Sequence, residues 1–432
     1  MERIEGNILM GVTPEDWDRV FSRPDKDNDV VRERVSEILL QIKSEGDSAV
    51  LRLTQQIDGG CFSSESLMVS PLEIEAASER LPDSFKDAIE VAYSNIEKFH
   101  SAQLRPTEEV ETLSGVVCSR RRVAIERVGL YIPGGSAPLF STVLMSAIPA
   151  RLAGCSSVVM ATPSDAQGRI ADEILYCARV CGVDTIYKLG GAIAVGALAY
   201  GTESIERVDK IFGPGNRYLT YAKESVSTKC VAIDIPAGPS EVMVVGDHTS
   251  RESFVAADLL SQLEHGGDSQ AIAVVTSLEL AHKVASELRS QAAQLSRSEI
   301  LGESMHNCLI IVEEDMEVIQ RMVDYYAPEH LIVSLEDADG FASRVRNAGS
   351  VFIGNFSPES VGDYASGTNH TLPTSGWAKS FSGVCVDSFS KYITYQKLTQ
   401  QGLASIAPTV ETMARHEGLT AHANAVRVRL ER

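Results

Sequence analysis

The chain has 432 residues, of which 44% are hydrophobic, and this is enough to fill two domain cores and smaller appended segments. Its 39 basic and 59 acidic residues give a net charge of −20 at pH 7. This charge repels phosphate backbones and anionic membrane surfaces, so it argues against nucleic acid and membranes as partners and suits a well-solvated globular protein.

Cysteine spacing and apolar run length bear on the compartment of the protein. The eight cysteines show no CxxC spacing, and a chain of this size does not need disulfides to fold, so we expect reduced thiols. The start of the chain lacks the basic segment and apolar core of a signal peptide, and no apolar run reaches about 18 residues. These features predict a cytoplasmic enzyme, and an organellar protein without its transit peptide would look the same.

The N-terminal part of the chain is predicted to be helical. Apolar residues recur at three- and four-residue spacing from Val30 to about Phe99, as in Val35, Ile38 and Ile42. We interpret this stretch as a helical lead-in, which is preceded by a small helical N-terminal tail over residues 1–26.

From Gly129 onward, short β-rich runs alternate with amphipathic segments. In a first series, each strand is followed by a helix, and the strands are predicted at Ser157–Ala161, Thr185–Leu189 and Val208–Phe212. A second series follows the same order, with strands predicted at Val242–Val245, Ala271–Val275, Leu309–Val312 and Leu331–Val333. Such alternation of strand and helix predicts βαβ units and parallel sheets.

Two βα series of comparable length predict an α/β fold with two Rossmann-like parallel-sheet domains from an apparent duplication. We expect residues 27–130 together with 241–384 to form the first domain and residues 131–240 to form the second. A small helical C-terminal tail over residues 385–432 ends the chain. A crevice between the two domains is the expected place for a small-molecule site.

Two glycine-rich turns follow apolar runs, at Gly129–Ser136 and at Phe212–Asn216, and the second directly precedes a predicted helix. Backbone N–H groups at such a helix start can hold a pyrophosphate. Neither turn has the GxGxxG pattern, so tight turns that need a positive φ are an alternative interpretation.

Four of the nine histidines lie near a carboxylate at a turn or at a helix end. The pairs are Glu264 with His265, Glu329 with His330, Asp363 with His370, and Glu417 with His422. Zinc coordination and proton transfer at neutral pH both use an imidazole whose tautomer and basicity are fixed by a neighbouring acid. The pairs therefore predict one site that is assembled from distant segments.

Two of these pairs also have ordinary structural interpretations. Gln262 and His265 share one face near a helix end, which suits half of a zinc site, but a histidine in that place also caps a helix dipole. Glu329 and His330 enter a predicted strand, where they could divide two proton transfers. The alternative is a surface acid beside a half-buried histidine.

The last two pairs lie in irregular or terminal segments. The stretch from Gly362 to His370 lacks periodicity and is rich in polar groups, which favours a functional loop over a structural one. Glu417 and His422 lie in a turn between two tail helices. A tail this short cannot form its own core, so we expect it to pack on another surface, such as a second subunit.

Taken together, these segments closely resemble the histidinol dehydrogenase family, whose enzymes complete histidine biosynthesis. The resemblance covers nearly the whole chain and runs in order through Gly129–Pro138, Phe212–Asn216, Pro236–Glu241, Gln262–His265, Tyr326–His330, Gly362–His370 and Leu419–His422. It implies a homodimer with shared active sites and one zinc ion per subunit. It also implies oxidation of L-histidinol to L-histidine through the aldehyde, with two NAD⁺.

The resemblance implies a ligand set for the zinc ion. The family's metal ligands match Gln262, His265, Asp363 and, donated across the dimer, His422. The imidazole and amino nitrogens of the substrate would complete the zinc shell, and nitrogen and oxygen ligands of this kind suit zinc. These positions place zinc and catalysis in the first domain, with the C-terminal tail reaching the partner subunit.

The resemblance also implies roles for the proton-handling and substrate-contacting residues. His330 corresponds to the general base that takes the alcohol proton, and Glu329 to the residue that activates water on the aldehyde. A four-electron oxidation in one site needs a base for each step, which accounts for two such residues. Further substrate-contacting positions match Ser240, His370 and Glu417, in addition to the metal ligands and His330.

The NAD-contacting positions of the family match Tyr131 and Asn216, which places the NAD side in the second domain. One departure concerns Ile193, which stands where the family commonly has a glutamine that contacts NAD. This isoleucine removes a polar group from the expected cofactor pocket but leaves the expected zinc ligands unchanged.

Two rival functions are compatible with many of the same residues. A dehydrogenase of the same superfamily could oxidise another small alcohol, such as a dihydroxypropane sulfonate. The carboxylate of Glu417 weighs against this substrate, because it suits the charged amine of an amino alcohol and would repel a sulfonate. A zinc hydrolase in which Glu329 activates metal-bound water would work without NAD⁺.

Overall fold

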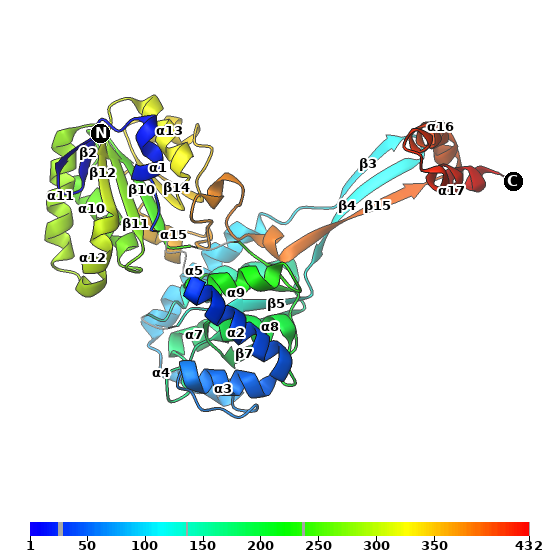
Figure 1. Cartoon of the computed structure of the whole chain (residues 1–432), viewed down its shortest axis with the longest axis horizontal. Coiled ribbons are helices and arrows are strands. Elements are labelled where there is room, and N and C mark those ends of the chain that lie inside the picture. Colours follow the sequence, from blue (N-terminus) through cyan, green and yellow to red (C-terminus); the bar gives the residue numbers. More distant parts are fainter. Residues whose placement is uncertain (25–28, 135–136, 236–237, 432) are drawn as a thin grey trace.

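Two α/β bodies and a projecting arm make up the molecule (Figure 1). The computed structural model describes residues 1–24, 29–134, 137–235 and 238–431. One body is built on a five-stranded sheet and the other on a seven-stranded sheet, while a three-stranded sheet runs out into the arm. The prediction of two domains with parallel sheets is confirmed, whereas the third sheet was not predicted.

The five-stranded sheet is parallel throughout and has the order β7-β6-β5-β8-β9. Its strands are β5 (Arg127–Tyr131), β6 (Ser157–Thr162), β7 (Thr185–Lys188), β8 (Lys210–Phe212) and β9 (Ala232–Ile233). The helices that follow these strands are α6 (Ser141–Ala153), α7 (Asp172–Val180), α8 (Gly191–Tyr200) and α9 (Arg217–Ser227). The strand order reverses between β5 and β8, and α/β sheets usually bind ligands beyond the carboxyl ends of strands at such a point.

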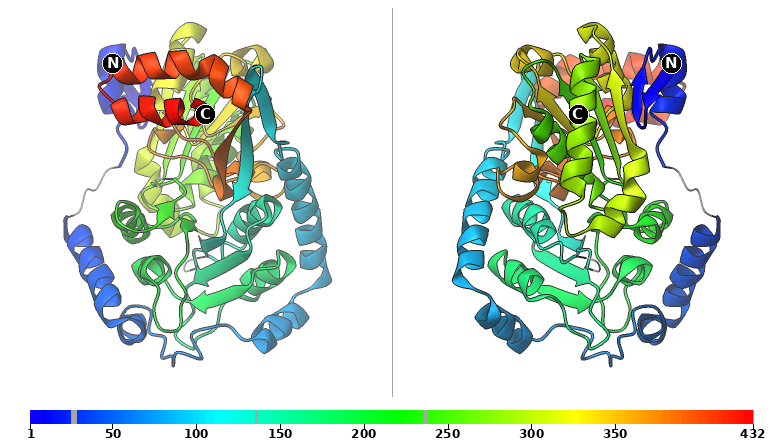
Figure 2. Two further views of the ribbon diagram at one scale, coloured as in Figure 1. Left: turned by 90° about the vertical axis from the view of Figure 1, so that its right-hand side faces the viewer. Right: turned by 90° about the vertical axis from the view of Figure 1, so that its left-hand side faces the viewer.

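The N-terminal helices belong to this same body, where they pack on the helices beside the five-stranded sheet, on both of its flanks (Figure 2). They are α2 (Asp29–Glu45), α3 (Asp47–Ile57), α4 (Pro71–Arg80) and α5 (Asp83–Ser101). Val35 of α2 shares a core with Ile193 of α8, and Ile96 of α5 shares one with Leu130 of β5. This packing differs from the expected grouping of residues 27–130 with 241–384, because an amphipathic pattern identifies a helix but not the sheet that it covers.

The seven-stranded sheet has the order β1-β2-β12-β11-β10-β13-β14 and is parallel except for β1. Its strands are β1 (Glu2–Glu5), β2 (Ile8–Met10), β10 (Glu241–Gly246), β11 (Gln270–Val275), β12 (Cys308–Val312), β13 (His330–Ser334) and β14 (Ser350–Ile353). The N-terminal tail, which was expected to be helical, thus contributes two edge strands before the short helix α1 (Trp17–Val20). Strands of three or four residues are too short for their alternation to be recognised.

Helices cover both faces of the seven-stranded sheet. They are α10 (Glu252–Leu263), α11 (Leu278–Ala292), α12 (Ser298–Ser304), α13 (Met316–Tyr326), α14 (Ala338–Ala342) and α15 (Glu359–Tyr364). Every residue of β10, β11 and β13 is buried, as expected for parallel strands between two helical layers. Within the described ranges, no helix is both long enough and apolar enough to cross a membrane.

The arm combines an antiparallel sheet with the two C-terminal helices. Its elements are β3 (Glu108–Leu113), β4 (Val116–Ala124), β15 (Ser390–Leu398), α16 (Gln400–His416) and α17 (Thr420–Leu430). Figure 1 shows α16 and α17 at the far end of the arm, away from both bodies. The helical C-terminal tail is confirmed, and the strand that leads to it leaves most of its side chains exposed.

Candidate active site at the amino edge of the seven-stranded sheet

Glu329 and His330 lie where the chain enters β13, in the interior of the seven-stranded sheet. Helix α13 ends at Tyr326, and the left-handed backbone of Ala327 (φ 52°) turns the chain toward the strand. His330 pairs with Val242 of β10 on one side and with Ser350 of β14 on the other. The exposed fractions of Glu329 and His330 are only 7% and 4%. The proton-handling pair predicted from the sequence is therefore buried at the amino ends of parallel strands.

The main chain of Glu241, the first residue of β10, contacts both members of the pair. Its N–H donates to Oε2 of Glu329 at 2.9 Å, and its carbonyl oxygen lies 3.2 Å from Nδ1 of His330. Because a carbonyl can only accept, Nδ1 carries a proton and Nε2 is the basic nitrogen of the neutral ring. Within the described residues, the buried Nε2 has no hydrogen-bond partner, and Oδ1 of Asp363 is 3.6 Å away. The arrangement presents a basic nitrogen to the site.

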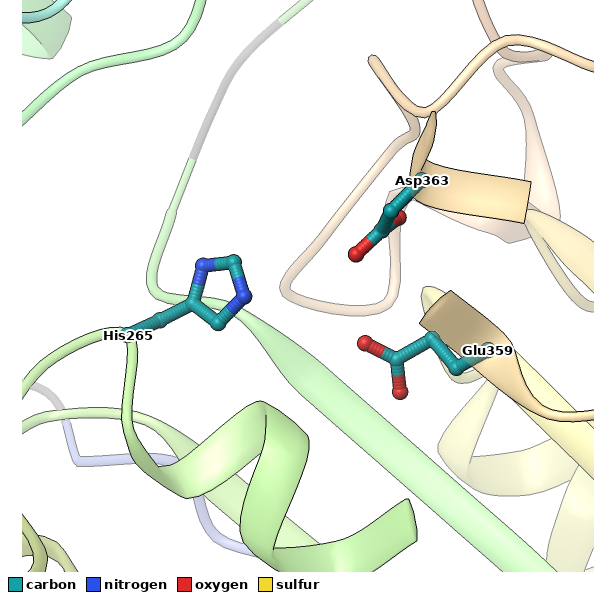
Figure 3. Close-up of side chains that lie close together, drawn as sticks. All are labelled: His265, Glu359 and Asp363. Carbon is teal, nitrogen blue, oxygen red and sulfur yellow. The ribbon is translucent and has the colours of Figure 1, made fainter. Parts of the chain in front are cut away.

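Three side chains beside this pair could hold a metal ion. His265 follows α10, while Glu359 and Asp363 are four residues apart on α15 and therefore share one face of that helix. Ligand atoms of the three residues all lie within 4.8 Å of one another (Figure 3). His265 and Asp363 were predicted as ligands from the sequence, whereas Glu359 was missed, although its i, i+4 spacing before Asp363 could have indicated it.

Gln262, which was also predicted as a ligand, reaches the same cluster from the last turn of α10. It is 1% exposed, and its amide is satisfied when the nitrogen faces Glu359 and the oxygen accepts the N–H of Glu241 at 2.9 Å. Glu241 then shares this one N–H between Gln262 and Glu329. Histidine nitrogen with carboxylate and amide oxygen is a donor set that suits zinc. The residues that are present thus fit the metal that the sequence analysis expected.

The carboxylates around the buried His330 outnumber the basic side chains beside them. Burial raises the pKa of Glu329 to about 8 and that of Glu359 to about 8. Burial acts to lower the pKa of His330, but the carboxylates of Glu359 and Glu329 outweigh it and raise this pKa to about 10. Burial opposes ionisation of Asp363, yet the imidazole of His330 keeps the pKa of Asp363 below its usual value. A bound cation would offset this excess of carboxylates.

The loop after α15 joins the cluster to the other body. His370 places Nδ1 2.9 Å from the carbonyl oxygen of Asp363 and Nε2 3.4 Å from Oγ1 of Thr142 in α6. Asn369 donates from Nδ2 to the carbonyl oxygen of Met145, also in α6. The loop that the sequence analysis predicted to be functional therefore closes the cluster against the five-stranded body.

The predicted NAD-contacting residues lie at the carboxyl edge of the five-stranded sheet. Tyr131 ends β5, and its hydroxyl accepts the N–H of Gly191 at the start of α8 at 3.1 Å. Asn216 caps α9, where its Oδ1 accepts the N–H of Leu219. Gly213 has φ 127°, and a Cβ on it would lie 2.1 Å from the carbonyl oxygen of Tyr131. The second glycine-rich turn therefore requires its glycine at the point where the strand order reverses.

Ile193, the departure from the resembling family, lies in the first turn of α8. It is 2% exposed and packs in an apolar cluster with Val35 and Leu39 of α2. The structure therefore places an apolar, buried side chain here, next to the edge that carries Tyr131.

The remaining predicted residues fall in two places. Ser240 directly precedes β10, and its carbonyl oxygen accepts the N–H of Gln270 at 3.0 Å, so it lies at the same amino edge as Glu329. Glu417 and His422 are exposed and lie at the end of the arm, in and beside the turn between α16 and α17. Figure 1 shows this turn far from the seven-stranded body of the same chain. One chain thus brings together the predicted catalytic and metal-binding residues of its seven-stranded body, whereas Glu417 and His422 lie at the end of the arm.

Known proteins resemble the chain over almost its whole length. The family model described as histidinol dehydrogenase matches residues 21–430. A histidinol dehydrogenase from Bacteroides fragilis is 50% identical over 415 residues, and one from Vibrio parahaemolyticus is 47% identical over 428 residues, covering 96% and 98% of both chains, respectively. The crystal structure of histidinol dehydrogenase from Elizabethkingia anophelis has 46% identity and a TM-score of 0.95, covering 98% of each chain. The chain belongs to the histidinol dehydrogenase family and is an NAD-dependent oxidoreductase.

Proposed function

We propose that the protein oxidises L-histidinol to L-histidine through L-histidinaldehyde, with two NAD⁺ and one zinc ion per subunit. The observation that carries this proposal is the juxtaposition of the buried Glu329–His330 pair with His265, Glu359 and Asp363, within a chain of this family. The seven-stranded body would perform catalysis, and the five-stranded body would bind the dinucleotide.

We assign His330 the role of the general base that removes the hydroxyl proton of the alcohol. Its Nδ1 is held by a carbonyl, so Nε2 of the neutral ring accepts the hydroxyl proton while the carbon-bound hydride leaves for the nicotinamide. The neighbouring carboxylates raise the pKa of His330, and a bound cation that offsets them would favour this neutral ring. This step forms the aldehyde, NADH and a protonated imidazole. The proton must then return to solvent before the second oxidation.

We assign Glu329 the role of the base that deprotonates the water molecule adding to the aldehyde. Burial raises its pKa, which makes its carboxylate a stronger base than an exposed one. As the water oxygen attacks the carbonyl carbon, its proton passes to Glu329, which gives the anion of the hydrate. Transfer of a hydride from this anion to a second NAD⁺ gives the carboxylic acid and NADH, and the acid then loses its proton to become the carboxylate.

Zinc would be held by Gln262, His265 and Asp363, with His422 from a second subunit. When bound, it anchors the imidazole and amino nitrogens of the substrate. Glu359 would then orient the Gln262 side chain by accepting a hydrogen bond from its amide nitrogen.

The position of the arm supports a homodimer. Glu417 and His422 are exposed, and the turn between α16 and α17 lies far from the seven-stranded body of its own chain, so these residues would complete a site in a second copy. Ser240, His370 and, from the second copy, Glu417 would contact the substrate. The carboxylate of Glu417 suits the ammonium group of histidinol.

NADH formation by the zinc-loaded protein tests the proposal. Histidinol with NAD⁺ should give turnover, a dihydroxypropane sulfonate should not, and removal of zinc with a chelator should abolish turnover until zinc is added back. No turnover with histidinol would overturn the proposal. Substrate hydrolysis in the absence of NAD⁺ would favour a zinc hydrolase instead.

A further inference from the structure

A single residue outside the predicted site touches both proton-handling side chains. Through its main chain, Glu241 donates its N–H to Glu329 and accepts from Nδ1 of His330. A main-chain group cannot rotate independently as a side chain does. The orientation of both side chains, and the tautomer of the imidazole, therefore depend on where the first residue of β10 sits.

The side chain of Glu241 is fastened by an arginine from the N-terminal tail. Its carboxylate is 2% exposed and receives a bidentate pair of bonds from Arg23, with Nε at 2.5 Å and Nη2 at 3.0 Å. Arg23 also donates to the carbonyl oxygen of Tyr326 at 2.7 Å and stacks over that ring at 4.2 Å. The N–H of Ser375 donates to the same carboxylate at 2.7 Å. The interactions around the Glu241 carboxylate thus connect the N-terminal tail, the end of α13 and the loop that contains Ser375 to the start of β10.

Backbone strain is concentrated around this contact. Over the described ranges, Ala327 and Ser375 are the non-glycine residues with positive φ, at 52° and 55°. Ala327 lies two residues before Glu329, and Ser375 supplies the N–H that binds Glu241. Such conformations persist where the surroundings impose them, and they gather at functional sites.

We propose that Arg23 and Glu241 are positioning residues for the catalytic pair. The bidentate bond holds the first residue of β10 so that its N–H and carbonyl group meet Glu329 and His330. This inference rests on the proposed roles of those two residues. The competing explanation is that the ion pair only fastens the N-terminal tail to the body.

Variants of the full-length, zinc-loaded protein distinguish the two explanations. Arg23→Ala and Glu241→Gln should each lower kcat for histidinol about 100-fold, with KM changed less than about threefold and zinc content unchanged. Because the two residues act as one unit, the double variant should lose about as much as either single variant. Arg80→Ala is the matched control, since Arg80 makes a bidentate pair with Asp172 at the surface. Its kcat should stay within about twofold of the wild type.

Chemical rescue of kcat distinguishes the positioning role further, because an ion pair that only fastens the tail would leave kcat unchanged. Arg23 lines a surface pocket of about 410 Å³ together with Arg19 and Gln270, so methylguanidinium can reach the vacated position in Arg23→Ala. It should restore most of the lost kcat, with no effect on Arg80→Ala. If Arg23→Ala does not fold, Arg23→Lys keeps the charge without the bidentate geometry and should lose about tenfold in kcat.

The failures of the two proposals are distinguishable. A folded Arg23 variant with wild-type kcat, or with a loss confined to thermal stability or KM, would overturn the positioning role while the wild type still oxidises histidinol. A wild-type protein that does not oxidise histidinol would overturn the proposed function, and the positioning role with it.

Discussion

The two sheet edges that meet at the domain boundary carry different chemistry. The amino edge of the seven-stranded sheet gathers titratable side chains, among them the buried Glu329 and His330 and the partly buried Asp363. The carboxyl edge of the five-stranded sheet instead offers glycine turns and helix starts, with Gly213 in close contact with β5. The first edge suits proton transfer and a cation, whereas the second suits a phosphate-bearing cofactor that is held by shape and by backbone N–H groups. Substitutions at the amino edge should therefore affect kcat and zinc content, whereas substitutions at the carboxyl edge should affect the KM for NAD⁺.

The largest effect is expected at the amino edge, from His330→Asn. Loss of the basic nitrogen should lower kcat for histidinol about 10⁴-fold, because Nε2 of His330 is the group assigned to take the alcohol proton. Steady-state NADH formation measures this loss. His248→Asn is the control, since His248 is 75% exposed and follows the carboxyl end of β10, at the opposite edge of the sheet from the cluster. More than a tenth of wild-type kcat in His330→Asn would show that another group is the base.

Glu329→Gln should separate the two half-reactions. We expect oxidation of histidinaldehyde to slow about 100-fold and oxidation of histidinol to slow much less, because only the aldehyde step needs activated water. Rates of NADH formation from the alcohol and from the aldehyde, supplied separately, give the comparison. Equal slowing of both steps would show that the assigned role is wrong.

The arm allows a test of whether the amino edge is shared between subunits. His330→Asn and His422→Asn should each be inactive alone, and His422→Asn should also bind zinc more weakly. Co-expression should restore about a quarter of wild-type activity, since half of the dimers are mixed and each mixed dimer has one intact site. No restoration in dimers shown to be mixed would mean that His422 serves its own chain or has no role.

A smaller effect is expected at the carboxyl edge, from Gly213→Ala. The added Cβ would meet the Tyr131 carbonyl, so the turn must shift, and KM for NAD⁺ should rise about tenfold with zinc content unchanged. Gly354→Ala is the control, because Gly354 also has a positive φ (87°) but nothing lies within 4 Å of its Cβ. Both variants should lose about 1–3 kcal/mol of stability from backbone strain. Equal KM values in the two variants would argue against a nucleotide at this edge.

Sequence patterns predicted the regular interior of both bodies, because buried parallel strands read as apolar runs. The resemblance, rather than periodicity, assigned roles to Glu329 and His330. Contacts made only by folding were missed: Glu359 joins the cluster through the packing of α15, and Arg23 reaches Glu241 across the sheet. The arm strands β3, β4 and β15 were missed because exposed or half-buried strands lack the apolar alternation that identifies a sheet.

The yield of NADH from a limiting amount of histidinol tests the central claim most directly. If the amino edge performs both oxidations with its two proton-handling groups, exhaustive reaction of the zinc-loaded protein should form two NADH and one histidine per histidinol. A yield of one NADH with accumulation of the aldehyde, or no NADH at all, would contradict the account.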